Sequence, residues 1–255
     1  MSEAATQKDP NGVLDSVRRA LGRSTTAAPV PLEPFNELAG ETDGAELIAR
    51  FTEEATAVRA KVYLMSAKLQ FGADGGDQSV TQPIDKLEFA GQIVEQIAEI
   101  CAVHSESEIA LAGAEVLSEI DLGSALATRR FSIFATKTPA ADHETLVARL
   151  ANCGVGITAA DYAIAETGTI VLSSDEQNAL LVSLLPPVHI AVLRSSQISA
   201  GLDEVISKLN RERVGPGNPS RSVSFITGPS RTSDVELTLS IGVHGPKELH
   251  VIIVD

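Results

Sequence analysis

The sequence predicts an α/β fold, an open and mostly parallel β-sheet flanked by helices, with an N-terminal helical arm before it. Three observations predict it. Helical and strand-like patterns alternate from Gly44 to Thr158, and short β-branched runs dominate after Gly168. The chain has 255 residues, of which 44% are hydrophobic, enough for one sizeable core. Alternation of this kind is typical of a parallel sheet with helices on its faces.

The N-terminal region, residues 1–43, is predicted to form an arm and a linker. Residues 13–21 carry apolar side chains at helical spacing, and Gly22 is well placed to end this amphipathic helix. A proline-rich stretch follows, a composition typical of an extended linker. We therefore expect the main α/β domain to span residues 44–255.

Helix-to-strand pairs are predicted in the first half of this domain. Each helix has an amphipathic pattern, and each strand is a short, largely apolar run. The helices are expected at residues 45–58, 86–100 and 141–153, and the strands at residues 61–65, 108–112 and 154–158.

The second half is expected to be rich in strands, with one convincing helix at residues 202–210. The predicted strands are residues 169–174, 188–194, 222–227 and 249–255. Residues 234–243 alternate apolar and polar side chains, which favours a further strand. A helix at that position, capped by Ser230 or Thr232, is the alternative.

Bulk composition argues against several function classes. The net charge of −14, the pI of about 4.8 and the absence of Trp oppose nucleic-acid binding. No stretch reaches the roughly 18 apolar residues of a membrane span, and residues 1–12 lack the apolar run of a secretory signal. Cys101 and Cys153 form no CxxC motif or Cys/His cluster, which gives no basis for a metal site in this chain. We expect a cytoplasmic protein.

The excess of acidic residues is confined to the first part of the chain. Residues 186–255 contain seven Lys or Arg and seven Asp or Glu. This closing segment can therefore hold a small anion without a strong opposing field.

The turn formed by Glu166, Thr167, Gly168 and Thr169 is a candidate ligand loop. It precedes a strand, and its small residues allow backbone N–H groups and hydroxyls to approach a ligand. The alternative is a turn capped by its own hydroxyls.

A nucleotide site has little support by comparison. Gly154, Gly156 and Ala159 match the GxGxxA spacing, but a helical pattern precedes them where the dinucleotide motif requires a strand.

His189 is a second candidate. It follows a Pro-Pro pair and directly precedes an apolar strand, so the stiff prolines can fix where the imidazole points. The alternative is a structural histidine at the entrance of a strand.

The closing stretch supplies a third candidate, a turn that contains Ser230, Arg231 and Thr232. Arginine suits bidentate binding of a carboxylate or phosphate, and the flanking hydroxyls can complete the shell of donors.

Asp234 and Glu236 stand two positions apart, and on a strand they share one face. They can serve acid–base chemistry or neutralise Arg231. His244 can titrate near neutral pH. The alternative is a solvated strand face with a surface ion pair.

Three stretches with these residues, AETGTIVL, LLPPVHIAV and TGPSRTSDVELTLSIGVHGPKELHVIIVD, resemble the lactate utilization protein C family, also called the LUD domain. The resemblance is dense over residues 154–255. It implies a fold like that of sugar-phosphate isomerases and coenzyme A transferases. It also implies a role in oxidising L-lactate to pyruvate beside iron–sulfur partner proteins, with no cofactor in this chain.

Three functional hypotheses follow. In the first, the chain is a non-redox subunit that binds a 2-hydroxy acid or its partners. Arg231 holds the carboxylate, Thr167 and Thr169 donate hydrogen bonds, and His244 or His189 accepts the hydroxyl proton. In the second, it is a stand-alone enzyme for a sugar phosphate or coenzyme A thioester, with Glu166 or Glu236 as base or nucleophile. In the third, it is a scaffold whose arm docks a partner.

Overall fold

The computed structural model describes residue 20 and residues 43–65, 86–104, 108–112, 115–136, 143–173, 179–213, 222–233 and 239–255. Residues 39–255 form one compact unit. Of the predicted arm and linker only Ala20 and residue 43 are described, so that prediction lies outside the described residues.

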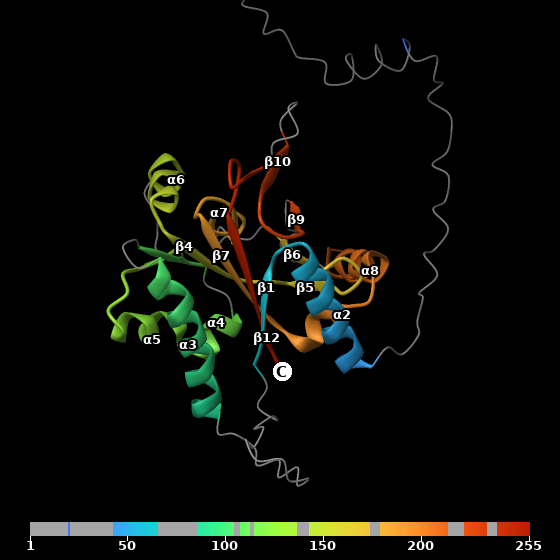
Figure 1. Cartoon of the computed structure of the whole chain (residues 1–255), viewed down its shortest axis with the longest axis horizontal. Helices are drawn as coiled ribbons and strands as arrows, with labels where there is room; N and C mark the ends of the chain where they lie inside the picture. Colours follow the sequence, from blue (N-terminus) through green and yellow to red (C-terminus); the bar gives the residue numbers. More distant parts are fainter. Residues whose placement is uncertain are drawn as a thin grey trace, which may run out of the picture. The chain divides into compact units, whose positions relative to one another are not determined.

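The main sheet has six parallel strands in the order β1-β12-β7-β4-β2-β3 (Figure 1). The strands are β1 Lys61–Met65, β2 Ile109–Leu111, β3 Ile133–Ala135, β4 Val155–Ala159, β7 Val188–Arg194 and β12 Glu248–Val254. Because all six run in the same direction, their first residues lie along one edge, called here the amino edge. The predicted open parallel sheet is confirmed.

One face of the main sheet is covered by α3 Lys86–Val103, α4 Glu115–Glu119 and α5 Leu122–Thr128. Ile93 and Ile97 lie one turn apart on α3, and both are buried in this core with Leu122 and Leu126 of α5. The two short helices α4 and α5 and the strand β3 were not predicted. They are too short for a clear period in the sequence.

The opposite face packs against α2 Gly44–Ala57, α6 His143–Ala151 and α7 Ala179–Leu184. Helix α7 corrects the expectation of a single helix after Gly168. A Cβ at Gly156 of β4 would overlap the carbonyl oxygen of Val182, so this glycine allows α7 to approach the sheet. The glycine of the formal GxGxxA match therefore has a packing reason.

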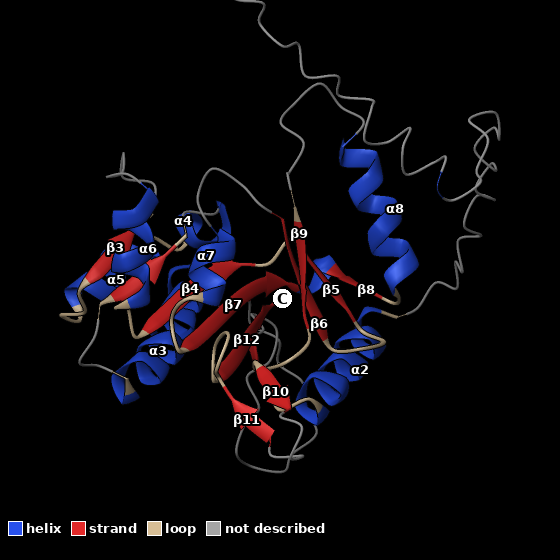
Figure 2. Cartoon of the chain, turned by 90° about the horizontal axis from the view of Figure 1, so that it is seen from above, coloured by secondary structure: helices blue, strands red, loops and turns tan. Residues whose placement is uncertain are grey.

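A second sheet of four strands, in the order β8-β5-β6-β9, lies between the main sheet and α8 Leu202–Arg213 (Figure 2). Its strands are β5 Tyr162–Ile164, β6 Thr169–Ser173, β8 Ile198–Ser199 and β9 Val223–Ile226, and a 3₁₀ turn at Ser195–Gln197 leads into β8. Val205 and Leu209 of α8 pack against Ile164 and Val171. The sequence predicted β6, β9 and α8, but not β5, β8 or a separate sheet.

Two short strands, β10 Arg231–Ser233 and β11 Leu239–Ile241, pair in antiparallel fashion. The described part of residues 230–243 is therefore strand and turn, so the alternative of a helix capped by Ser230 or Thr232 does not hold there. Residues 234–238, with Asp234 and Glu236, lie outside the described residues.

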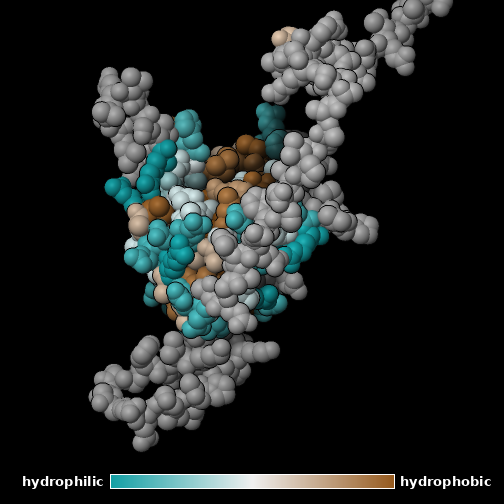
Figure 3. Space-filling view, turned by 90° about the vertical axis from the view of Figure 1, so that its right-hand side faces the viewer, coloured by the Kyte–Doolittle hydropathy of each residue, from teal (hydrophilic) through white to brown (hydrophobic). Residues whose placement is uncertain are grey.

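The helices of the described residues and one face of the molecule show two further features. None of the helices in the described part of the chain is long and apolar enough to cross a bilayer. On the side of the molecule that carries α8 in Figure 1, apolar residues gather in a patch among hydrophilic ones (Figure 3).

Candidate functional site

Four turns that are distant in the sequence meet near the amino edge of the main sheet. They are residues 165–168, 185–187, 227–230 and 242–247, which lie before β6, β7, β10 and β12. The Oγ1 atoms of Thr169 and Thr227 are 2.7 Å apart. The backbone N–H of Ser230 donates to the Pro246 carbonyl at 2.9 Å, and that of Lys247 donates to the Pro187 carbonyl at 2.7 Å. We call the four joined turns the motif surface.

The first turn, between β5 and β6, is fixed by Gly168 and by hydroxyls. Gly168 has φ of +61°, and a Cβ there would overlap the backbone of Ala55 in α2. The Thr167 and Thr169 Oγ1 atoms lie 2.7 Å apart, so the hydroxyls of Thr167, Thr169 and Thr227 form a chain. These are the bonds of a turn held by its own hydroxyls, and a ligand-binding role for Thr167 and Thr169 stays a prediction.

Glu166 extends from the same turn to the surface. Its side chain is exposed, and its Oε2 lies 3.3 Å from where a Cβ at Gly201 would stand. Its backbone N–H donates to the Ala200 carbonyl at 3.1 Å. The carboxylate thus lies beside the connection between β8 and α8.

Arg231 ties the third turn to the connection between α2 and β1. Its guanidinium donates to the carbonyl of Val58, and a Cβ at Gly228, which has φ of +83°, would clash with that same carbonyl. A guanidinium has five N–H donors, and this contact uses one of them. Arg231 is exposed, and the side chain of Thr232 lies outside the described residues.

The fourth turn carries His244, which is exposed. A Cβ at Gly245 would lie 3.2 Å from the Ser230 Cβ, so this turn packs directly on the one that holds Arg231. The fold therefore brings Ser230, Arg231 and His244 into one region. Their order in the sequence did not require this.

His189 is separated from these exposed groups by burial. It is 1% exposed, and its Nε2 lies 2.8 Å from the Thr158 hydroxyl on β4. Burial, with a smaller effect from the neighbouring His250, lowers the pKa of His189 to about 3. Its Nδ1 has no hydrogen-bond partner among the described residues. The imidazole is neutral at pH 7, in the manner of a structural histidine.

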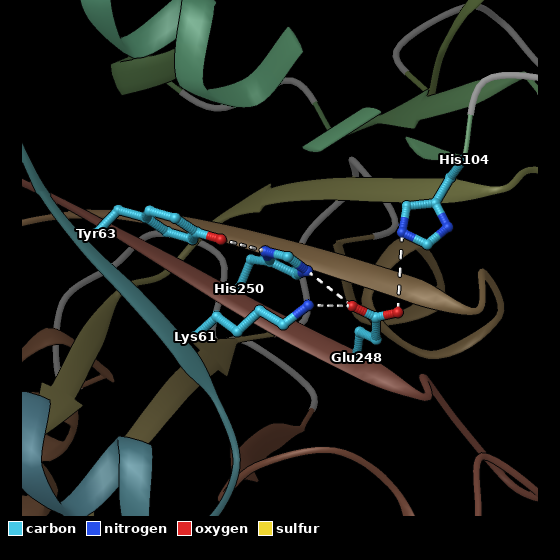
Figure 4. Close-up of polar contacts among 5 residues, drawn as sticks. All are labelled: Lys61, Tyr63, His104, Glu248 and His250. Atoms are coloured by element: carbon cyan, nitrogen blue, oxygen red, sulfur yellow. Dashed lines mark hydrogen bonds and ion pairs between the residues drawn. The ribbon is translucent and has the colours of Figure 1, made fainter. Parts of the chain in front are cut away.

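A cluster of polar residues that the sequence reasoning missed lies on β1, β12 and the end of α3 (Figure 4). We call it the Glu248 cluster, and its members are Lys61, Tyr63, His104, Glu248 and His250. Three nitrogen atoms surround the Glu248 carboxylate: Lys61 Nζ at 2.6 Å, His250 Nε2 at 3.3 Å and His104 Nε2 at 3.9 Å. The Tyr63 hydroxyl lies 3.2 Å from His250 Nδ1.

The charges of this cluster affect one another. The hydrogen bond from Lys61 is the main cause that lowers the pKa of Glu248. Burial, followed by the positive charge of Lys61, lowers the pKa of His250, and burial raises the pKa of Tyr63. At pH 7 Lys61 and Glu248 therefore form an ion pair, while the His250 imidazole and the Tyr63 phenol are neutral.

The signal for this cluster was present in the sequence. Lys61 and Tyr63 stand two apart in one strand, and Glu248 and His250 stand two apart in another. Residues two apart on a strand share a face, and polar side chains in an otherwise apolar parallel strand are unusual. That β1 and β12 are neighbours could not be read from the sequence.

An open hollow of about 530 Å³ lies where the strands β2 and β3 meet the helices α4 and α5, lined mainly by apolar residues that include Leu117, Leu122 and Ile133. It contains none of the predicted site residues. No group of three metal-ligating side chains within the described ranges is arranged to hold an ion.

Curated relatives of the chain are lactate utilization proteins. Lactate utilization protein C of Halalkalibacterium halodurans is 37% identical over 112 residues, which are 44% of this chain and 49% of that protein. The protein of the same name from Macrococcus caseolyticus is 39% identical over 109 residues (43% and 46%), and that from Anoxybacillus flavithermus is 28% identical over 167 residues (65% and 72%). The first two matches span about half the length of those relatives.

A solved structure and a family model complete the comparison. The crystal structure of a DUF162 family protein from Deinococcus radiodurans has a TM-score of 0.53 and 21% identity, over 84% of this chain and 99% of that one. It supports the fold. The model of the LUD domain matches residues 86–254, which include all four turns of the motif surface. Since that match covers more than half of the sequence, the chain belongs to the LUD domain family.

Proposed function

We propose that the protein works in lactate utilization, as a non-redox component of an iron–sulfur-dependent system that oxidises L-lactate to pyruvate. The name that the curated relatives share supports the pathway. The observation that carries a role for this chain is the joining of the four turns into one motif surface by side-chain and backbone contacts. Such a surface is held in place before a ligand arrives, which reduces the ordering cost of binding.

The motif surface binds a small organic acid, or a partner subunit that presents one. Arg231 is suited to hold the carboxylate because the Val58 carbonyl fixes its guanidinium at one donor. His244 and Glu166 are exposed on the same surface. Oxidation of lactate to pyruvate releases two electrons and two protons. In this proposal the electrons pass to iron–sulfur clusters of partner proteins, and this chain supplies binding.

The first test is recovery of the tagged chain from its native extract. Co-purifying proteins are identified, and iron and lactate-dependent dye reduction are measured on the recovered material. We expect iron-containing partners and lactate oxidation. A lone, iron-free protein that turns over sugar phosphates or thioesters would overturn the proposal.

The second test is Arg231→Ala in the same complex. Loss of a charged hydrogen-bonded contact of about 1.5–3 kcal/mol weakens binding by about 10- to 100-fold. We expect the KM for lactate to rise by that factor. The matched control is Arg50→Ala, which removes an exposed arginine of α2 outside the motif surface. Equal KM values for the two variants would show that Arg231 does not hold the carboxylate.

A further inference from the structure

We propose that Tyr63, His250 and Glu248 form an acid–base relay that exchanges a proton with the hydroxyl of a small organic acid through the Tyr63 phenol oxygen. Nothing in the family resemblance assigns a role to Tyr63 or His250. The ligand class rests on the proposed function, and the relay itself rests on the geometry of the Glu248 cluster (Figure 4).

The hydrogen bonds of the relay have one consistent direction. A carboxylate accepts only, so His250 donates from Nε2–H to Glu248, whose oxygen is 3.3 Å away. The Nδ1 of a neutral imidazole is then an acceptor, and it receives the Tyr63 hydroxyl at 3.2 Å. The tautomer is thus assigned from the network. The arrangement follows the logic of a catalytic triad, with a phenol in the place of the nucleophile.

The side chains of the relay differ in how far they are exposed to solvent. The His250 side chain is 4% exposed, whereas that of Glu248 is 35% exposed. Tyr63 is half-buried, and Lys61 beside it is 57% exposed. The imidazole is shielded from water, whereas Tyr63 is partly exposed and lies on β1 beside the exposed Lys61. In this proposal a ligand reaches the Tyr63 oxygen from the side of Lys61.

The proton transfer balances without a redox step. When a ligand hydroxyl gives its proton to the Tyr63 oxygen, the O–H bond of the ligand breaks and a new one forms on the phenol. The ligand oxygen keeps the electron pair of the broken bond as an alkoxide. The proton that Tyr63 held passes to His250 Nδ1, which forms an imidazolium. Glu248 stabilises that cation through the Nε2–H bond. The reverse sequence returns the proton.

Lys61 gives the cluster a cation that can share the ligand carboxylate with Arg231, whose guanidinium bonds to the carbonyl of Val58, three residues before Lys61. Its ammonium carries three donors, and Glu248 takes one at 2.6 Å. Because Lys61 and Tyr63 share a face of β1, a bound carboxylate at Lys61 places an adjacent hydroxyl near the phenol.

Charged groups from every neighbouring element bear on His250. Lys61 of β1, Glu248 of β12, and His104 at the end of α3 act on it directly. His189 of β7 pairs with Leu249, so its side chain lies on the other face of the sheet, and only a weak repulsion couples it to His250. Glu99 of α3 acts on Tyr63. Burial and Lys61 outweigh the attraction of Glu248, so the pKa of His250 is lowered and its Nδ1 carries no proton at pH 7.

The relay is joined to the motif surface through the backbone. Glu248 is the first residue of β12 and directly follows the turn with His244. Lys247 and Glu248 both donate their backbone N–H to the Pro187 carbonyl, at 2.7 and 3.3 Å. The relay on β12 therefore begins directly beside the motif surface, at the amino edge of the main sheet.

Tyr63→Phe in the intact lactate-oxidising complex tests the relay. General acid–base catalysis contributes about 10²- to 10⁴-fold, so we expect kcat to fall at least about a hundredfold, with KM within about twofold. We also expect the acidic limb of the pH profile, which reports neutral His250, to disappear in the variant. Tyr162→Phe is the matched control, since it alters the other tyrosine of the chain, on β5.

A structural role for Tyr63 would lower the yield of folded complex but leave the pH profile of the remaining activity unchanged. Tyr63→Phe with the wild-type kcat and pH profile, in a complex that oxidises lactate, overturns the relay and leaves the proposed function standing.

A second measurement does not depend on lactate oxidation. The ¹⁵N signals of the His250 ring are followed in the isolated chain while L-lactate or pyruvate is added. A change in the wild type that is lost in Tyr63→Phe supports the relay, even if the complex proves inactive with lactate. The absence of any His250 response to both acids overturns it.

Discussion

The hydroxyl oxygens of Thr169 and Thr227 lie 2.7 Å apart although 58 positions separate the two residues. This contact joins β6 of the second sheet to the turn that carries Arg231. Thr169 is 4% exposed, and its oxygen also lies 2.7 Å from that of Thr167. Thr169 is therefore the central member of a hydroxyl chain that holds two turns of the motif surface together.

Thr169→Val should lower the free energy of unfolding by about 1 kcal/mol, because it keeps the side-chain shape but removes both hydrogen bonds. Urea denaturation measures the change. Thr167→Val is the matched control. Thr167 is exposed and is the outer member of the three bonded hydroxyls, so water can replace its bond to Thr169. A larger loss for Thr167→Val than for Thr169→Val would contradict this account.

Gly168→Ala should lower the free energy of unfolding by more than about 2 kcal/mol. A left-handed backbone costs an L-residue about 1–2 kcal/mol, and at φ of +61° the new Cβ would also overlap the backbone of Ala55. Gly44→Ala is the control, because Gly44 begins α2 and a Cβ there meets nothing within 4 Å. Thermal and urea unfolding should separate the two variants, and similar stabilities would refute the prediction.

The stability of the protein should fall in mild acid because of His189. Its pKa is about 3 in the folded state and about 6.5 when unfolded, so the unfolded state takes up the proton first. The stability that neutral His189 supplies is complete above pH 6.5 and is lost as the pH falls toward 3. Between pH 6.5 and 5 this loss is on the order of 1–2 kcal/mol, before most carboxylates titrate.

The measurement is the free energy of unfolding against pH for the wild type and for His189→Gln, which cannot titrate in this range. His250 acts with the same sign because its pKa is also lowered, so the difference between the two curves isolates His189. Parallel curves from pH 6.5 to 5 would show that His189 does not drive the acid response.

The fold was accessible to sequence reasoning wherever a periodic pattern was long enough. Helix α3 and the strands β7 and β12 were found because long amphipathic or apolar runs have few other stable arrangements. The five-residue α4 and the two-residue β8 were missed, since elements of one turn or one pair of residues leave no period to detect. Helix α7 was missed because its six residues are apolar almost throughout, so they show no helical period.

Part of the candidate site was also predictable from the sequence, and part was not. Turn chemistry marked Gly168 and Arg231, because few residues suit a positive φ or a forked set of donors. The sequence did not indicate that Arg231 would bond to Val58, or that His189 would be buried against Thr158. Those contacts depend on which strands and turns are neighbours.

By itself, the sequence determined the class of fold and the turns whose residue types are unusual, because these follow from local periodicity and local stereochemistry. The family came from the resemblance of three motifs. Only the tertiary structure decided that four distant turns form one surface, and that Tyr63 faces His250. The physical reason is strand order. The pairing of β1 with β12, 187 positions apart at the Lys61 and Glu248 contact, is selected by packing of the whole sheet, and no local pattern encodes it.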